Sequence, residues 1–310
     1  GFTQSGPSFH LKTRALEKNL QKAFPAGISL VYPTGPHRLS PADIPFPLPS
    51  QQQQQKEGGG GDEQQNEELE AYAWWRAQGN PNDPSSKMTY TGLEQGLATI
   101  SHTLATQGPF DGVIGFSQGA ACAAMITSLL EPGRAAAFSS HLSSAEKEEE
   151  EGIMPFPSSF SPENLQHPPL KFAALYSGFM ARGGKKYEAF YHPRIATPTL
   201  HFLGMLDAVV EEARSLRLAE RCEGTTTVKD GVVEVGVGGP DGKQQDKDDK
   251  YTSRVIYHPG GHFLPASQKA YVGALVGFIK EVLASHDDDD EGKKKKDKEE
   301  ESVEDMDMPF

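Results

Sequence analysis

The sequence predicts an α/β fold with a doubly wound, mostly parallel sheet. Strand-like apolar runs alternate with helix-like runs along the 310-residue chain, a pattern typical of a parallel sheet covered by helices on both faces. A second observation is a G-x-S-x-G pentapeptide at residues 115–119, which stands between a strand-like run and a helix-like run. The third is that low-complexity stretches separate the periodic segments. Without these stretches, the rest of the chain has the normal size of one α/β domain.

Each periodic segment is assigned by its apolar spacing and its turn residues. The predicted strands are residues 28–32, 112–116, 172–176, 199–203 and 254–257. The predicted helices are residues 10–24, 90–105, 120–130, 211–221 and 268–284. Residues 67–78, which include Trp74 and Trp75, are predicted to form a short helix. We favour the interpretation that these tryptophans anchor this segment to the domain. The alternative is that they form the base of an acyl pocket.

The domain is predicted to span residues 1–285, with insertions near 50–66, 141–167 and 225–250. These insertions are poor in apolar residues and are interpreted as expanded surface loops. Residues 286–310 are predicted to be a disordered charged tail, which holds more than half of the net charge of −13. The remaining core is only mildly acidic, which argues against a nucleic-acid surface, and no apolar run is long enough to cross a membrane.

The pentapeptide predicts a nucleophilic serine. A sharp strand-to-helix turn needs small residues around it, and Gly115 and Gly119 flank Ser117. The following helix would direct its free N–H groups toward the serine, so the N–H of Gln118 is well placed to bind a negatively charged oxygen. The alternative is a glycine-flanked turn that only packs a helix on the sheet.

An activated serine needs a base and a carboxylate to orient it, and both follow in the order expected for this kind of sheet. Asp207 lies in the loop after the strand at 199–203, and His262 lies in the loop after the strand at 254–257. His258 is a rival base, but it precedes Pro259 and is biased to an extended conformation. His262 follows two glycines and is preferred. The structural alternatives are a helix cap for Asp207 and a backbone-bonded loop histidine for His262.

Four spaced motifs, at residues 1–6, 115–121, 198–210 and 258–263, resemble the FSH family of α/β-hydrolase serine hydrolases, which is found in fungi. The resemblance implies Ser117 as nucleophile, Asp207 as acid and His262 as base. It also implies that the backbone N–H groups of Phe2 and Gln118 form the oxyanion hole. The family begins with a strand that leads into Leu-His-Gly, whereas this chain begins at Gly1, so the first strand is expected to be missing.

Apolar residues on the loops at the same sheet edge predict a substrate pocket without an obvious cation. They are Phe179, Met180, Met205, Val209, Phe263 and Leu264. The predicted function is hydrolysis of carboxylic esters or thioesters, and the resemblance includes thioesterases that release polyketides. Two alternatives stay open: a peptidase or amidase on the same triad, and a noncatalytic interaction protein on a hydrolase fold.

The sequence contains neither Cys and His at zinc spacing nor a phosphate-binding G-x-x-x-x-G-K-[ST] loop, so we expect no metal and no cofactor. Its two cysteines, Cys122 and Cys222, are interpreted as ordinary thiols. The expected partner is a small-molecule ester or thioester, without nucleic acid or a membrane span. The predicted location is the cytoplasm, with the nucleus as an alternative, and a targeting segment ahead of Gly1 stays open.

Overall fold

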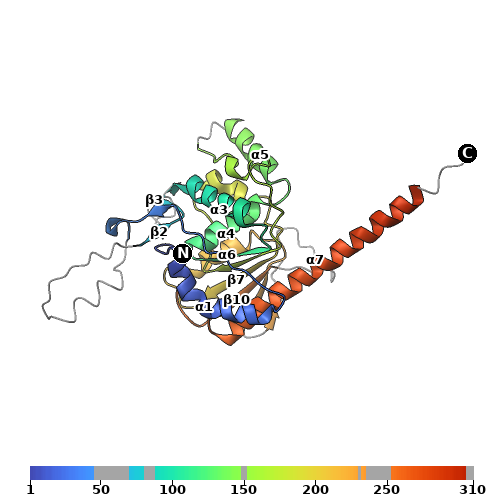
Figure 1. Ribbon diagram of the computed structural model, residues 1–310. Coiled ribbons are helices and arrows are strands. Elements are labelled where there is room, and N and C mark those ends of the chain that lie inside the picture. Colours follow the sequence, from blue (N-terminus) through green and yellow to red (C-terminus); the bar gives the residue numbers. More distant parts are fainter. Residues whose placement is uncertain (45–69, 80–87, 148–151, 230–231, 235–252, 305–310) are drawn as a thin grey trace, which may run out of the picture.

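A computed structural model describes residues 1–44, 70–79, 88–147, 152–229, 232–234 and 253–304. Its central feature is the sheet that contains β7 and β10 in Figure 1. The strand order of this sheet is β5-β6-β7-β10-β8-β9. These strands are β5 (Gly112–Phe116), β6 (Phe172–Tyr176), β7 (Thr199–Gly204), β8 (Thr226–Lys229), β9 (Val232–Glu234) and β10 (Arg254–His258). All neighbours pair in parallel except β9, which is antiparallel to β8. The prediction of a mostly parallel sheet is confirmed.

Helices cover both faces of this sheet (Figure 1). They are α1 (Gly6–Ala23), α3 (Leu93–Gln107), α4 (Gln118–Leu129), α5 (Arg134–Lys147), α6 (Glu212–Ala219) and α7 (Lys269–Glu304), with short 3-10 turns η1 (Pro41–Asp43), η2 (Ser158–Phe160) and η3 (Gly184–Phe190). Strand β6 shows how the two layers arise. Ala173 and Leu175 belong to the core cluster that contains α4, whereas Ala174 and Tyr176 belong to the cluster that contains α1 and α7. This alternation follows from the two-residue period of a strand.

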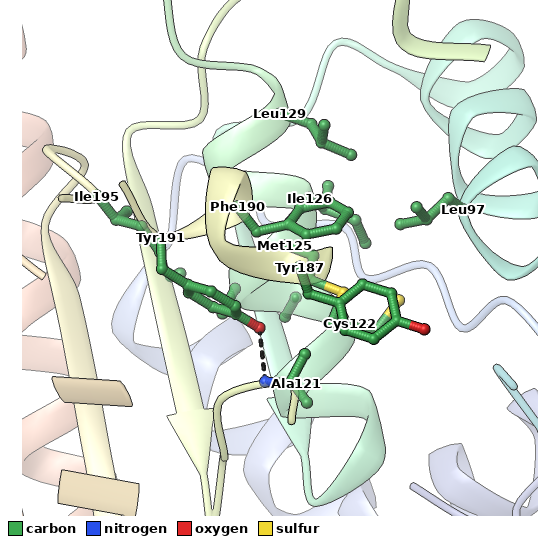
Figure 2. Packing of buried hydrophobic residues seen from close by; sticks show 14 of the residues in the cluster. Leu97, Ala121, Cys122, Met125, Ile126, Leu129, Tyr187, Phe190, Tyr191 and Ile195 are labelled. Atoms are coloured by element: carbon green, nitrogen blue, oxygen red, sulfur yellow. Dashed lines mark hydrogen bonds between the residues drawn. The ribbon is translucent and has the colours of Figure 1, made fainter. Parts of the chain in front are cut away.

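Helix α4, which begins directly after the pentapeptide, is buried around its whole circumference. Figure 2 shows Ala121, Cys122 and Met125 of this helix packed under the aromatic rings of η3. Tyr191 closes this layer, and its hydroxyl oxygen accepts a hydrogen bond of 3.0 Å from the N–H of Ala181. Helix α4 therefore has little freedom to shift, and the start of the helix is held in place.

Residues 28–32, predicted as a strand, are not part of any named strand. Ile28 and Leu30 are nonetheless half-buried against the α1–α7 core cluster. A strand needs a hydrogen-bonded neighbour, and within the described ranges β5 is the edge of the sheet and pairs only with β6. The prediction of a strand at residues 28–32 is therefore wrong, although its apolar residues pack against the core.

The helix predicted at residues 67–78 is wrong in its described part, which contains two short strands. β2 (Tyr72–Ala73) pairs with β1 (His37–Arg38), and β3 (Arg76–Gln78) pairs with β4 (Thr89–Thr91). Their backbone groups thus have partners elsewhere in the chain, which outweighs a weak local helix preference. The interpretation of the tryptophans as anchors holds for Trp75, which is buried in the core.

The predicted insertions pack more than expected. Residues 50–66 lie outside the described ranges, but Met154, Phe160 and Leu165 from the second insertion are buried in the α4 core. In the third, β8 and β9 extend the sheet. These segments contain isolated apolar residues among many polar ones. Their average hydrophobicity is therefore low, although single apolar side chains pack into the core.

The tail predicted to be disordered from residue 286 continues helix α7 as far as Glu304. Lys and Glu are good helix formers and together outnumber the weaker helix formers Asp and Gly in this stretch, so the helix that begins in the core can extend. In Figure 1 this part of α7 runs away from the body of the protein. No helix in the described ranges combines the length and apolarity needed for a membrane span.

Candidate active site

Ser117 lies at the carboxyl end of β5 and precedes the first residue of α4. Its backbone has φ 54° and ψ −121°, a conformation that non-glycine residues rarely adopt and that is typical of strained functional sites. The turn is tight because a Cβ on Gly115 would lie 2.4 Å from the carbonyl oxygen of Gly119. The prediction that glycines are required on both sides of the serine thus has a direct steric cause at Gly115. At Gly119 a Cβ would meet no atom nearer than 3.6 Å, so the requirement does not extend to that position.

Three side chains from three different loops form a continuous hydrogen-bonded chain. His262 Nε2 lies 3.0 Å from Ser117 Oγ, and His262 Nδ1 lies 2.8 Å from Asp207 Oδ2. The ring of His262 also packs against that of Phe116, with centroids 4.8 Å apart. The structure therefore brings together the serine, histidine and carboxylate that the sequence singled out.

The loops that carry Asp207 and His262 touch through their backbones. The N–H of Leu206 donates to the carbonyl of Gly260 over 3.0 Å. A Cβ on Gly204 would lie 2.5 Å from the carbonyl oxygen of Gly261. Because the backbones approach this closely only without a side chain between them, the two loops form one rigid support for the acid and the histidine.

Asp207 is held as a carboxylate by several donors. Its side chain is 2% exposed. Oδ1 accepts hydrogen bonds from the N–H groups of Val209 and Val210, at 3.0 and 2.8 Å. Oδ2 accepts one from Ser177 Oγ at 2.8 Å, in addition to the bond with His262. Burial alone would raise the pKa of Asp207, but these hydrogen bonds outweigh it and hold the pKa below its usual value.

Ser177 was missed by the sequence analysis. It follows β6 directly, is buried, and has a positive φ of 47°. Its location at the carboxyl end of a parallel strand was the available signal, since such ends gather at the functional edge of an α/β sheet. A lone serine at a strand end carries no spacing pattern, so the sequence alone did not separate it from a turn residue.

The rival histidine, His258, does not reach the serine. It is buried at the end of β10, its Nδ1 accepts a hydrogen bond from the N–H of Gly260, and the rings of Phe263 and Tyr271 pack edge-on against it. Burial lowers the pKa of His258, so the neutral form is favoured. The preference for His262 over His258 agrees with this geometry.

Gln118 contributes more than the backbone N–H that the sequence indicated. Its side-chain Oε1 accepts a hydrogen bond from the N–H of Trp74, and its Nε2 donates to the carbonyl of Trp75, both at 2.9 Å. This amide clamp fixes the β2–β3 segment to the start of α4. The other predicted oxyanion donor, Phe2, lies in a turn with its ring against a small cluster formed by Leu39, Ile44, Ala71 and Ala73.

The predicted pocket residues fall into three groups. Phe179 and Met180 are half-buried against the α4 core, whereas Leu264 packs against the α1–α7 core. Met205, Val209 and Phe263 are 68%, 59% and 39% exposed. In the described structure the six residues therefore form no single buried cluster, and the exposed members lie on the two loops that carry Asp207 and His262.

The parallel sheet, the strained serine between β5 and α4, and the acid and histidine after β7 and β10 define an α/β-hydrolase. The family model described as serine hydrolase (FSH1) matches residues 1–230. The chain belongs to this family of serine hydrolases.

The chain is also similar to several individual proteins. Esterase OVCA2 of Mus musculus is 29% identical over 284 residues, which cover 90% of this chain and 93% of that protein. Family of serine hydrolases 3 of Saccharomyces cerevisiae is 27% identical over 282 residues, covering 91% and 82%. A Schizosaccharomyces pombe protein named dihydrofolate reductase is 29% identical over 271 residues, covering 86% of this chain but only 42% of that protein. Among solved structures, esterase PE8 is similar with a TM-score of 0.49 and 18% identity, covering 91% and 89%.

Proposed function

We propose that this serine hydrolase cleaves carboxylic esters or thioesters through an acyl-enzyme on Ser117. The single observation that carries the proposal is the chain of hydrogen bonds from Ser117 Oγ through His262 to Asp207 Oδ2. The same arrangement recurs on unrelated folds that hydrolyse acyl groups and is recognised by geometry. The names of the esterase relatives agree with this choice of substrate.

The first half-reaction acylates the serine. Ser117 Oγ attacks the substrate carbonyl carbon while its proton moves to His262 Nε2. Asp207 keeps the other ring nitrogen, Nδ1, protonated and stabilises the imidazolium that forms. The negative oxygen of the tetrahedral intermediate is bound by the N–H of Gln118 and, as the family resemblance implies, that of Phe2. The bond to the leaving group then breaks, and His262 returns the proton to the alcohol or thiol.

The second half-reaction repeats these steps with water. His262 takes a proton from the water as it attacks the acyl carbon, and gives that proton to Ser117 Oγ as the acid is released. The conformation of Ser117 supports this role, since the strained backbone at the start of a buried helix holds the hydroxyl 3.0 Å from His262 Nε2.

The substrate is proposed to carry an aliphatic acyl group, a polyketide-like chain included. Phe179 and Met180 offer half-buried apolar surface after β6, and Met205, Val209 and Phe263 offer exposed apolar surface on the other two loops. Each methylene that such surface removes from water adds up to about 0.8 kcal/mol to binding.

A cytoplasmic location stays a prediction from the sequence.

The test combines labelling with a substrate series. A fluorophosphonate probe is expected to modify Ser117, and Ser117→Ala is expected to lose both labelling and turnover. Ser139→Ala, an exposed serine on α5, is the matched control and should behave like wild type. With p-nitrophenyl esters from acetyl to decanoyl, kcat/KM should rise with chain length, while the matching anilides should react far more slowly.

The possible failures are distinct. Full turnover in Ser117→Ala would contradict the nucleophile, and comparable rates on anilides would favour an amidase. Absence of hydrolysis and of labelling in the intact protein would favour a noncatalytic role.

A further inference from the structure

Exposed apolar side chains gather at the candidate active site. Six large hydrophobic side chains are exposed within the described ranges, and two of these lie on α1 and α5. The other four lie on the two loops that carry the acid and the histidine: Met205, Leu206, Val209 and Phe263. Single exposed apolar residues are ordinary on a protein surface, whereas a group of them marks a binding surface.

Leu206 is the most exposed of the four, at 74%. It directly precedes Asp207 in the chain and is not among the residues proposed to hold the acyl group. The N–H of Leu206 donates to the carbonyl of Gly260, so its backbone is fixed in the contact between the two loops. Leu206 therefore cannot be buried by a local rearrangement without breaking that contact.

The four side chains belong to one rigid pair of loops. The N–H of Met205 donates to the carbonyl of His258 over 2.9 Å, and the N–H of Phe263 donates to the carbonyl of Gly261 over 3.0 Å. A Cβ on Gly261 would lie 3.2 Å from the carbonyl oxygen of Leu206. These contacts hold the exposed side chains of the two loops beside one another.

These loops also carry almost no charge. Besides His262, residues 204–210 and 259–268 contain one ionisable side chain, that of Asp207, which is 2% exposed. In contrast, 24% of the whole chain is charged, with a net charge of −13. Basic residues would favour an anionic membrane, and these two loops contain neither Lys nor Arg. Their composition suits an uncharged apolar surface.

The location of the loops indicates what covers them. The side chain of His262 is 18% exposed, and its Nε2 lies 3.0 Å from Ser117 Oγ. A second copy of the chain, or a partner protein, that covered the apolar side chains would also cover His262 and keep an ester away from Ser117. A surface composed of ester molecules covers the same side chains and supplies the substrate.

We propose that Met205, Leu206, Val209 and Phe263 adsorb the protein to droplets of water-insoluble, uncharged long-chain esters, which Ser117 then hydrolyses. This inference rests on the proposed ester hydrolysis and names the physical state of the substrate. Adsorption removes the exposed apolar side chains from water. The lack of exposed charge on the loops avoids the cost of transferring charged groups into an apolar phase.

Adsorption is tested without turnover. Ser117→Ala protein is mixed with an emulsion of trioctanoin, the droplets are floated by centrifugation, and the ratio of bound to free protein is measured. Adding Leu206→Ser should lower this ratio about tenfold, because an apolar side chain of this size contributes at least that factor to burial. Leu206→Met, which stays apolar, should retain adsorption. Leu11→Ser, at a 64% exposed leucine on α1, is the matched control and should leave the ratio unchanged.

The active protein provides the second measurement. As tributyrin is raised through its solubility limit, the rate of wild type should rise steeply once droplets form. Leu206→Ser should reduce the droplet-dependent part of the rate about tenfold, in step with the lost adsorption. Its kcat/KM for dissolved p-nitrophenyl acetate should equal that of wild type, so a misfolded variant is recognised directly.

The outcomes separate this inference from the proposed function. Hydrolysis of dissolved esters without adsorption to droplets, or equal adsorption of Leu206→Ser and its parent, would overturn the adsorption surface alone. Binding to phosphatidylcholine vesicles but not to ester droplets would overturn it in favour of a membrane. A dimer that Leu206→Ser converts to monomers in sedimentation would overturn it in favour of a second copy. Failure to hydrolyse both dissolved and dispersed esters would overturn the proposed function and this inference together.

Discussion

The hydrogen bond from Ser177 to Asp207 gives a sharp test of how the acid is held. Ser177→Ala removes the donor that lies 2.8 Å from Asp207 Oδ2. Both side chains are buried, so water does not readily replace the hydroxyl. A hydrogen bond to a charged group contributes about 1.5–3 kcal/mol, and the free energy of unfolding should fall by that amount. With one restraint on Oδ2 lost, kcat/KM for a p-nitrophenyl ester should fall by about tenfold, the lower end of the same range.

Ser177→Gly separates the hydrogen bond from backbone strain. The φ of 47° costs a side chain about 1–2 kcal/mol, and glycine removes this cost while adding about 0.5–1 kcal/mol of unfolded-state entropy. The glycine variant should therefore be more stable than the alanine variant by roughly 0.5–1 kcal/mol, with the same loss of activity. Urea unfolding of the three proteins at pH 7 measures the difference.

The pH dependence of stability distinguishes a role in holding the acid from simple packing. Because the folded-state pKa of Asp207 is below the ordinary 3.8, its contribution is complete above that value and is lost as pH falls through the folded-state pKa. Ser177→Ala moves that pKa upward, so the variant should lose stability at a higher pH than wild type. If Ser177→Ala loses stability at the same low pH as wild type, the reasoning is refuted. A glycine variant that is less stable than the alanine variant would also refute it.

Three further predictions concern neighbouring residues. Ser117→Ala and His262→Ala should each abolish most turnover, and the double variant should lose little more than either single variant. Folded His258→Gln should keep most of the turnover. Additive losses in the double variant would indicate that Ser117 and His262 have separate roles. Gln118→Ala leaves buried backbone groups unpaired and should lower the free energy of unfolding by about 2 kcal/mol in urea titrations, while equal stability would exclude the clamp. Burial lowers the pKa of His201 from 6.5 to about 3, so stability should decline as pH falls from 6.5 toward 3, and His201→Gln should flatten this decline in unfolding measured across that range.

The grouping of Ser117, Asp207 and His262 in the candidate site could be predicted from the sequence because local patterns mark its members. Ser117 lies in a glycine-flanked turn, and His262 follows two glycines. The edges of the fold were less predictable. Whether residues 28–32 form a strand depends on a partner that is distant in sequence, and the helix predicted near Trp74 was overridden by pairing with β1 and β4.

The side chain that supports Asp207 could not be predicted from the sequence for a related reason. Ser177 contacts Asp207 across two loops that are far apart in the chain, and it belongs to no spaced motif. Side chains that support a site can be recognised only once the loops have been placed.

The clamp formed by Gln118 also determines which part of this protein its tryptophan fluorescence reports on. The chain contains only two tryptophans, Trp74 and Trp75, and both are hydrogen-bonded through their backbones to the side chain of Gln118. A Cβ on Gly119 would lie 3.7 Å from the indole nitrogen of Trp74. All of the indole fluorescence therefore originates beside the candidate active site. Because we propose that Ser117 is acylated, we expect its acylation to change the native tryptophan emission, which can be followed in real time without attaching a dye.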